Sequence, residues 1–225
     1  MQLLEDIARL SLFLPILLFL LRKKAKKKEV WVIFYFLIFS VIQQIIFAFT
    51  QKNAPGIAKI VDFTNPITYL IFIWLYFNVV IASSSYKKII FILTSFYIII
   101  QIGPIFFDLS KTYISIITTL NTLIILFFCL FYFYEQLRFP KTVFIYSQNS
   151  FWGTAAFLLF SSGTFFVFWY NQIPNQSKDF ENQYIVIHAS IYILRNLFFS
   201  MAIIIKPEKS SLSDESSVLF ASIKA

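Results

Sequence analysis

The residues with the strongest chemical character inside an apolar stretch are His188, Tyr192 and Arg195. They stand at positions i, i+4 and i+7 of the segment 184–205, so a helix would carry them on one face, within about 60°. At about 1.5 Å per residue, Arg195 is about 16 Å from either end of that segment. A charged side chain near the middle of a bilayer is costly and usually faces the interior of a helix bundle. We therefore predict a polar intramembrane site centred on Arg195, with Tyr192 and His188 extending it outward.

Arg195 has no acidic partner in the apolar segments of the sequence, and Glu135 is the acid closest to it in depth. Three interpretations of Arg195 follow. The side chain extends along its helix to reach the membrane surface, or it bonds to amide and backbone oxygens, or it holds an anionic ligand. The second interpretation predicts a bridge to Gln43, Gln44 or Asn78 and a loss of stability in Arg195→Leu.

His188 and the small or hydroxyl-bearing residues have simpler interpretations beside the functional ones. An interfacial histidine is a simpler reading of His188 than a ligand or a proton relay. Ser and Thr in the segments 113–134 and 151–170 are expected to bond to their own helix backbone or to join neighbouring helices. Gly153, Ala156 and Gly163 predict a small-residue face for close helix packing.

The composition places the chain in a membrane and argues against an enzyme. Of its 225 residues 59% are hydrophobic and 13% are charged, and its mean hydropathy is +0.75. Soluble domains are about 45–50% apolar and about 25% charged. One cysteine excludes a CxxC site, and one histidine excludes an HExxH zinc site. We therefore expect no catalytic residues, no cofactor and no metal site.

Apolar windows of about 20 residues are the length that crosses a bilayer as a helix. Seven windows qualify, near 7–21, 30–50, 66–83, 89–107, 113–134, 151–170 and 184–205. They predict an all-α membrane protein, a seven-transmembrane-helix bundle that forms a single domain over 1–205. The Ser-rich segment 206–225 is expected to be a disordered cytoplasmic tail.

The distribution of Lys and Arg orients the predicted spans. Thirteen basic residues lie on the side of the segment 22–28 and five on the opposite side. Because positive loops stay cytoplasmic, we predict that the N-terminus is outside and the C-terminus is cytoplasmic. The acidic pair Glu5 and Asp6 precedes the first apolar run, which favours a retained reverse anchor over a cleaved signal peptide.

The segment 22–28 is the most basic part of the chain. Beside a membrane span, such a cluster is expected to contact a lipid bilayer with anionic headgroups, although a partner protein or a nucleic acid is an alternative ligand. We expect no nucleic acid. The predicted headgroup contacts are Arg22, Lys23, Lys24, Lys26, Lys27 and Lys28.

The C-terminal 90 residues or so, with the stretch "YEQLRFP" followed by "SFWGTAAFLLFSSGTFFVF" and "IHASIYILRNLFFSMAI", carry a resemblance. They resemble the last two spans of a family of small, uncharacterised bacterial seven-helix integral membrane proteins. The matching positions are Tyr134 and Glu135, then Ser161, Ser162 and Gly163, then Ile187, His188 and Asn196. The resemblance implies a bacterial inner-membrane location and a link to signalling kinases. Family members often have a glutamate in the third span, where this chain has "YLIFIWLYF" instead.

These observations favour a non-enzymatic sensor or receptor-like module that acts through a membrane or cytoplasmic signalling partner. Seven spans without a soluble catalytic domain suit the sensing of a ligand or of the membrane state. The alternatives are a small-solute transporter, or a structural or assembly subunit of a membrane complex. An intramembrane enzyme lacks support, because paired carboxylates, a Ser-His pair at a plausible depth and a metal-ligand set are missing from the spans.

Overall fold

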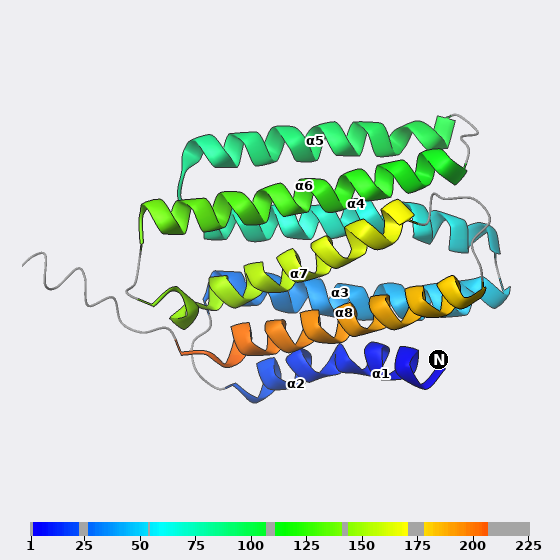
Figure 1. Ribbon diagram of the computed structural model, residues 1–225, viewed down its shortest axis with the longest axis horizontal. Helices are drawn as coiled ribbons and strands as arrows, with labels where there is room; N and C mark the ends of the chain where they lie inside the picture. Colours follow the sequence, from blue (N-terminus) through cyan, green and yellow to red (C-terminus); the bar gives the residue numbers. More distant parts are fainter. Residues whose placement is uncertain are drawn as a thin grey trace, which may run out of the picture.

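The computed structural model describes residues 2–22, 27–53, 55–106, 111–140, 144–170 and 178–206, and within these ranges every regular element is a helix. The helices lie side by side along one long axis (Figure 1). Their bounds are α1 Gln2–Ser11, α2 Phe13–Leu21, α3 Lys28–Asn53, α4 Pro55–Val80, α5 Ser84–Phe106, α6 Lys111–Arg138, the 3₁₀ turn η1 Ile145–Ser147, α7 Asn149–Tyr170 and α8 Lys178–Ile204.

Five stretches of helix in the described residues are long and apolar enough to cross a membrane. They are Lys28–Thr50, Ser84–Ile102, Ile116–Arg138, Asn149–Val167 and Asn182–Ile204, and Thr64–Val80 is a shorter apolar helix. Large apolar side chains on the outside of the bundle, such as Ile45, Phe49 and Ile99, are 63%, 68% and 69% exposed. Lipid can cover this surface, whereas water would penalise it. The fold is that of a helical membrane protein.

The first predicted span, 7–21, is not a single helix. The chain forms α1 and α2 with a break at Leu12. Pro15 explains the break, because it has no N–H to donate to the carbonyl of Ser11, and its ring crowds that carbonyl. Ser11 instead turns its hydroxyl back to the Ala8 carbonyl, at 2.6 Å.

The helices differ from the predicted spans at several boundaries. The expected outer connection 51–65 is helical at every described position, because α4 already begins at Pro55. Proline suits the first turn of a helix, where its missing N–H has no partner to lose. The third span ends at Val80 and not at 83, and α8 begins at Lys178, inside the expected connection 171–183. The predicted disordered tail lies almost entirely outside the described residues.

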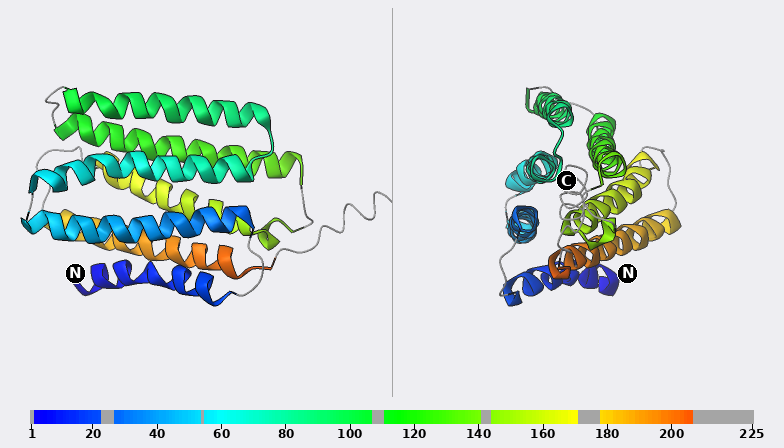
Figure 2. Two further views of the ribbon diagram at one scale, coloured as in Figure 1. Left: turned by 180° about the vertical axis from the view of Figure 1, so that it is seen from behind. Right: turned by 90° about the vertical axis from the view of Figure 1, so that its left-hand side faces the viewer.

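The first helices of the chain pack against the last. Both α1 and α2 contact α8 more extensively than α2 contacts α3. The N-terminus and the end of α8 lie at opposite ends of the bundle (Figure 1). Seen end-on, α3 and α4 form one side, and α6, α7 and α8 form the other (Figure 2). The face that carries Arg195 therefore has neighbours from most of the bundle.

An aromatic core joins the two sides. The ring of Phe157 on α7 meets Phe199 at 5.1 Å, Tyr76 at 5.2 Å and Phe36 at 5.8 Å between centroids, all edge to face. This geometry places the positive ring edges on the negative ring faces. The core ends beside the middle of α8, where the candidate site begins.

The two described glycines of α7 permit close approach to two different helices. A Cβ at Gly153 would overlap the Tyr76 hydroxyl of α4, and a Cβ at Gly163 would overlap the Ile191 side chain of α8. The sequence suggested that the small residues of α7 form a single packing face. Gly153 and Gly163 instead face two different helices. They bring α7 close to helices on both of its sides.

Candidate functional site

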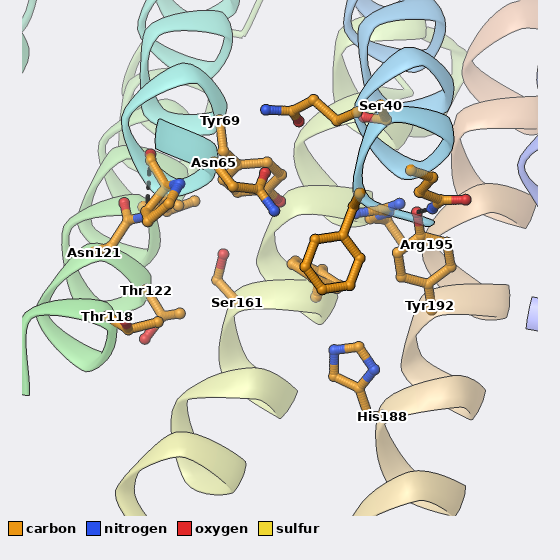
Figure 3. Close-up of a pocket in the computed structure, with 16 residues that line it drawn as sticks. Ser40, Asn65, Tyr69, Thr118, Asn121, Thr122, Ser161, His188, Tyr192 and Arg195 are labelled. Atoms are coloured by element: carbon orange, nitrogen blue, oxygen red, sulfur yellow. Dashed lines mark hydrogen bonds between the residues drawn. The ribbon is translucent and has the colours of Figure 1, made fainter. Parts of the chain in front are cut away.

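A cavity of about 420 Å³ lies inside the bundle, between α3, α4, α6, α7 and α8 (Figure 3). We call it the Arg195 pocket. Its lining combines polar side chains from all five helices with a few aromatic ones. The lining residues are Ser40, Gln43, Gln44, Phe47, Asn65, Pro66, Tyr69, Thr118, Asn121, Thr122, Ile125, Phe160, Ser161, His188, Tyr192 and Arg195. No acidic residue is among them.

Five of the six residues predicted to form a polar site line this pocket: Arg195, His188, Tyr192, Gln43 and Gln44. The sixth, Asn78, does not. Its side-chain amide donates to the carbonyl of Trp74 one turn back on α4, at 3.0 Å. Polar side chains in apolar helices often satisfy themselves in this way, and no sequence pattern separates them from residues that face a cavity.

Arg195 is buried, with 2% of its surface exposed. Its guanidinium carbon lies 4.0 Å from the centroid of the Tyr192 ring and 4.5 Å from that of Phe160. Phe36 and Phe199 follow at 5.8 and 5.9 Å. Aromatic faces attract a cation most strongly where water is excluded. The core rings thus stabilise the charge inside the bundle.

The hydrogen bonds of Arg195 differ from the expected ones. Its Nε and Nη2 atoms both donate to Oδ1 of Asn196, at 3.4 and 3.3 Å, and not to Gln43, Gln44 or Asn78. The Asn196 amide in turn donates to the Ser11 hydroxyl at 2.8 Å. A chain of hydrogen bonds therefore connects the pocket to α1.

The two glutamines of α3 bond to helices on opposite sides. The Gln44 amide donates to the Tyr192 hydroxyl of α8 at 2.7 Å, and the Gln43 amide donates to the Thr68 hydroxyl of α4 at 2.9 Å. Both bonds cross between helices, so α3 is positioned relative to α4 and α8 by polar contacts at the level of the pocket.

Three buried polar atoms of the pocket have no hydrogen-bond partner among the described residues. They are the Tyr69 hydroxyl, the Ser161 hydroxyl and the Asn121 side-chain oxygen. The Arg195 guanidinium is close enough to interact with the Tyr69 oxygen as a donor, but it has no acceptor for the hydroxyl proton. An unpaired buried polar group costs about 1–3 kcal/mol, so each of these atoms has the capacity to bond to water or a ligand.

His188 lies at one end of the pocket (Figure 3). Its ring is parallel to that of Tyr184, with centroids 6.0 Å apart, and Phe160 is 6.4 Å away. Within the described ranges, no three His, Cys, Asp or Glu side chains come together as a metal site would require. The pocket therefore offers a ligand neutral hydrogen-bonding groups and the positive charge of Arg195.

A second cavity of about 600 Å³ adjoins the first, between α1, α2, α3 and α8. Four residues line both cavities: Gln44, Phe47, His188 and Tyr192. The Gln44–Tyr192 hydrogen bond therefore lies on their shared wall. Glu5 and Arg9 also line this cavity and approach each other to 4.0 Å.

The basic segment is described only in part. Arg22 donates to the backbone carbonyls of Ile203 and Ile205, at the end of α8. Its charge thereby meets the negative end of the helix dipole. Lys27 and Lys28 are exposed, and Lys23, Lys24 and Lys26 lie outside the described residues. The predicted contact of these lysines with anionic headgroups stays a prediction.

Where α6 ends and α5 begins, a second set of polar side chains bonds across helices. We call the set Tyr76, Tyr132, Glu135, Asn149 and Ser150 the closed end. Here the Glu135 carboxylate of α6 accepts the backbone N–H groups of Ala82 and Ser83, at 3.0 and 2.9 Å, where α5 begins. A carboxylate at a helix N-terminus is favoured by the helix dipole.

The remaining bonds of the closed end involve α7 and α8. The Tyr76 hydroxyl donates to the Ser150 carbonyl at 2.8 Å, and the Tyr132 and Ser150 hydroxyls are 3.1 Å apart. The Asn149 amide donates to the Ala202 carbonyl at 2.6 Å. Sequence reasoning did not identify this cluster, because its members are ordinary interfacial residues until the helices are assembled.

No family model, curated protein or solved structure that we compared with this chain matches it. The resemblance of the C-terminal spans to a bacterial seven-helix family therefore stays a prediction. The functional argument has to come from the geometry of the pocket.

Proposed function

We propose that this chain is a seven-pass protein of a bacterial inner membrane that acts as a receptor-like sensor. In this proposal the N-terminus is outside, the C-terminus is cytoplasmic, and the bundle signals through a partner protein. The excess of basic residues on one side supports the orientation. The opposite placement of the N-terminus and the end of α8 is compatible with an odd number of passes (Figure 1).

In this proposal, two further passes add to the five long apolar helices and give seven. One is α4, whose apolar part is Thr64–Val80. The other is the pair α1 and α2, which runs beside α8 and presents exposed Leu17, Leu20 and Leu21. About 20 residues of helix extend about 30 Å, the thickness of the hydrocarbon core, so the pair is long enough to cross despite the break at Leu12.

The observation that carries the proposal is the Arg195 pocket. A ligand in this cavity would contact side chains from five helices at once. A ligand shifts a conformational equilibrium only if it contacts the two states differently. Binding between five helices changes their relative packing more readily than binding to one element does, and packing shifts of this kind reach the cytoplasmic ends of the helices.

A screen for bound ligands tests this function. The full chain, purified in detergent, is heated in the presence of a collection of small polar metabolites, beside Arg195→Gln as the pocket variant and Asn78→Ala as the control. A sensor is expected to be stabilised by at least one compound, with the effect lost in Arg195→Gln and retained in Asn78→Ala. Stabilisation that is equal in all three chains would contradict a ligand site at Arg195.

Two cysteine variants test the orientation independently. Asn182 and Lys27 are exposed and lie near opposite ends of the bundle. Asn182→Cys is expected to react with an impermeant maleimide outside intact cells, and Lys27→Cys to react only after lysis. The native Cys129 is fully buried and provides the unlabelled background. The reverse pattern would overturn the orientation.

A small-solute transporter is the second candidate, and the adjoining cavity favours it. Two cavities in series, divided by the Gln44–Tyr192 bond, resemble part of a path across the bundle. Proteoliposomes that contain the chain separate the two functions. A transporter exchanges a labelled ligand across the membrane, whereas a sensor binds the same ligand without exchange.

A further inference from the structure

We infer that the ligand of the Arg195 pocket is a small organic carboxylate with an apolar or aromatic body. This inference rests on the proposed function, since it names the ligand class of the same site. It is carried by the charge of the pocket, by the direction of its unpaired donors, and by its apolar wall.

The first step concerns charge. Arg195 is the cation of the pocket, and none of the side chains that line it is acidic. Asn196 supplies one neutral oxygen, and the rings of Tyr192 and Phe160 supply their faces. None of these groups cancels the charge. A buried ion is stabilised chiefly by an opposite charge with good geometry, so the ligand is expected to be an anion.

The second step concerns the donors. Arg195 donates from Nε and Nη2 to the Asn196 oxygen, at 3.4 and 3.3 Å, so a neutral amide oxygen accepts these bonds and no acid does. The Tyr69 and Ser161 hydroxyls are unpaired among the described residues. Figure 3 shows these three side chains around the pocket, from α8, α4 and α7. A carboxylate accepts about four hydrogen bonds on two oxygens, which matches donors that come from separate directions.

The third step concerns the rest of the cavity. Phe47, Ile125 and Phe160 line it together with the polar groups. A volume of about 420 Å³ is far larger than one inorganic ion requires. Ligand pockets of this size typically combine an apolar wall with a few polar groups that fix orientation. An apolar body on the carboxylate would fill this wall and displace water from it.

Benzoate and benzamide are the probes that test the ligand class, because they share a shape and differ in charge. The full chain in detergent is titrated with each, and with sulfate, and the rise in melting temperature gives the apparent Kd. Benzoate is expected to stabilise the protein and benzamide to have little effect. Equal effects of benzoate and benzamide, or of benzoate and sulfate, would overturn the inference.

Variants place the effect in the pocket. Arg195→Gln is expected to weaken benzoate binding about a hundredfold, since it removes a charge-assisted contact. Tyr69→Phe removes an unpaired hydroxyl without changing the ring, so this variant should fold as well as the parent and bind about tenfold more weakly. Asn78→Ala is the control with unchanged affinity. Unchanged affinity in Tyr69→Phe and Arg195→Gln would also overturn the inference.

The two proposals fail separately in these experiments. If benzoate does not bind but a neutral metabolite stabilises the parent and not Arg195→Gln, the ligand class is wrong and the sensor remains supported. If benzoate binds as described and proteoliposomes exchange it across the membrane, the ligand class is right and the sensor is replaced by a transporter.

Discussion

The Arg195 pocket and the closed end contain similar polar side chains but use them differently. At the closed end, the hydroxyl of Tyr76 bonds to the backbone of α7, and the carboxylate of Glu135 bonds to the backbone of the connection between α4 and α5. In the pocket, the hydroxyls of Tyr69 and Ser161 have no partner among the described residues. The closed end has exceptions, because the side-chain oxygen of Asn149 and the side-chain amide of the nearby Gln136 also have no partner among the described residues.

This difference suggests that the closed end contributes mainly to stability and the pocket mainly to ligand binding. Bonds that cross between helices fix one arrangement of the bundle, and unpaired groups around a cavity leave binding capacity for another molecule. We therefore expect substitutions at the closed end to lower stability most, and substitutions in the pocket to change stability less than ligand binding. The following predictions test that comparison, in order of decreasing effect on stability.

The largest effect is expected at Glu135. Glu135→Leu removes the carboxylate that accepts the N–H groups of Ala82 and Ser83, and should lower the free energy of unfolding by about 3 kcal/mol. Glu135→Gln retains one acceptor and should lose about half as much. Thermal unfolding in detergent measures both. Glu5→Gln, which breaks only an exposed ion pair, is the control and should be nearly neutral. A Leu variant as stable as this control would contradict the structural role of the closed end.

A methyl group at Gly153 comes next. Gly153→Ala would push the Tyr76 hydroxyl away from the Ser150 carbonyl, and should cost about 2 kcal/mol from overpacking and the lost bond. The same unfolding experiment provides the measurement. Ser162→Ala on the same helix removes a hydroxyl that bonds only to its own backbone at Leu159, so it should change stability little. Similar values for the two variants would show that α7 and α4 can separate without cost.

Arg195 should have a smaller effect on stability than on binding. Arg195→Leu loses the aromatic contacts and leaves Oδ1 of Asn196 unpaired, but it also removes a buried charge, so we expect a net loss of about 1.5 kcal/mol. Arg195→Lys keeps the charge and loses the planar group, and should fall between Leu and the parent. If the Leu variant unfolds at the parent's temperature or above, neither the rings nor Asn196 hold the guanidinium in place.

The smallest effect is expected from Tyr192→Phe. This change removes only the hydrogen bond from Gln44, at a cost of about 0.5 kcal/mol. Because that bond lies on the wall between the two cavities, its loss should speed the reaction of a small thiol reagent with Ser161→Cys in the pocket. Rates are compared in the Ser161→Cys background with and without Tyr192→Phe. Equal rates would mean that the bond does not limit access to the pocket.

The sequence indicates the centre of the candidate site better than its extent. Arg195 is conspicuous because a charge stands in the middle of an apolar segment, and helical spacing adds Tyr192 and His188. Tyr69 could not be identified in this way, since an aromatic residue in a membrane helix usually packs against lipid or core. Asn78 has the same chemical character as Asn121, yet one bonds to its own helix and the other lines the pocket. Only the packing of the helices decides between them.

The fold shows the same division. Hydropathy locates the apolar segments well, because lipid exposure acts on each helix separately. The break at Leu12 could also be predicted from the sequence, because Pro15 interrupts the hydrogen bonding of a helix. The bonds of Glu135 could not be predicted, because they depend on which helix ends meet, and a single sequence does not show that.

The packing of α1 and α2 on α8 has a consequence for how the protein is made. The pair α1 and α2 is synthesised before α8, yet α8 is the helix it contacts most. Ser11 meets Asn196, and Arg22 meets the carbonyls of Ile203 and Ile205, only after α8 has been synthesised. A nascent chain that stops before α8 therefore exposes the first segment without its docking surface.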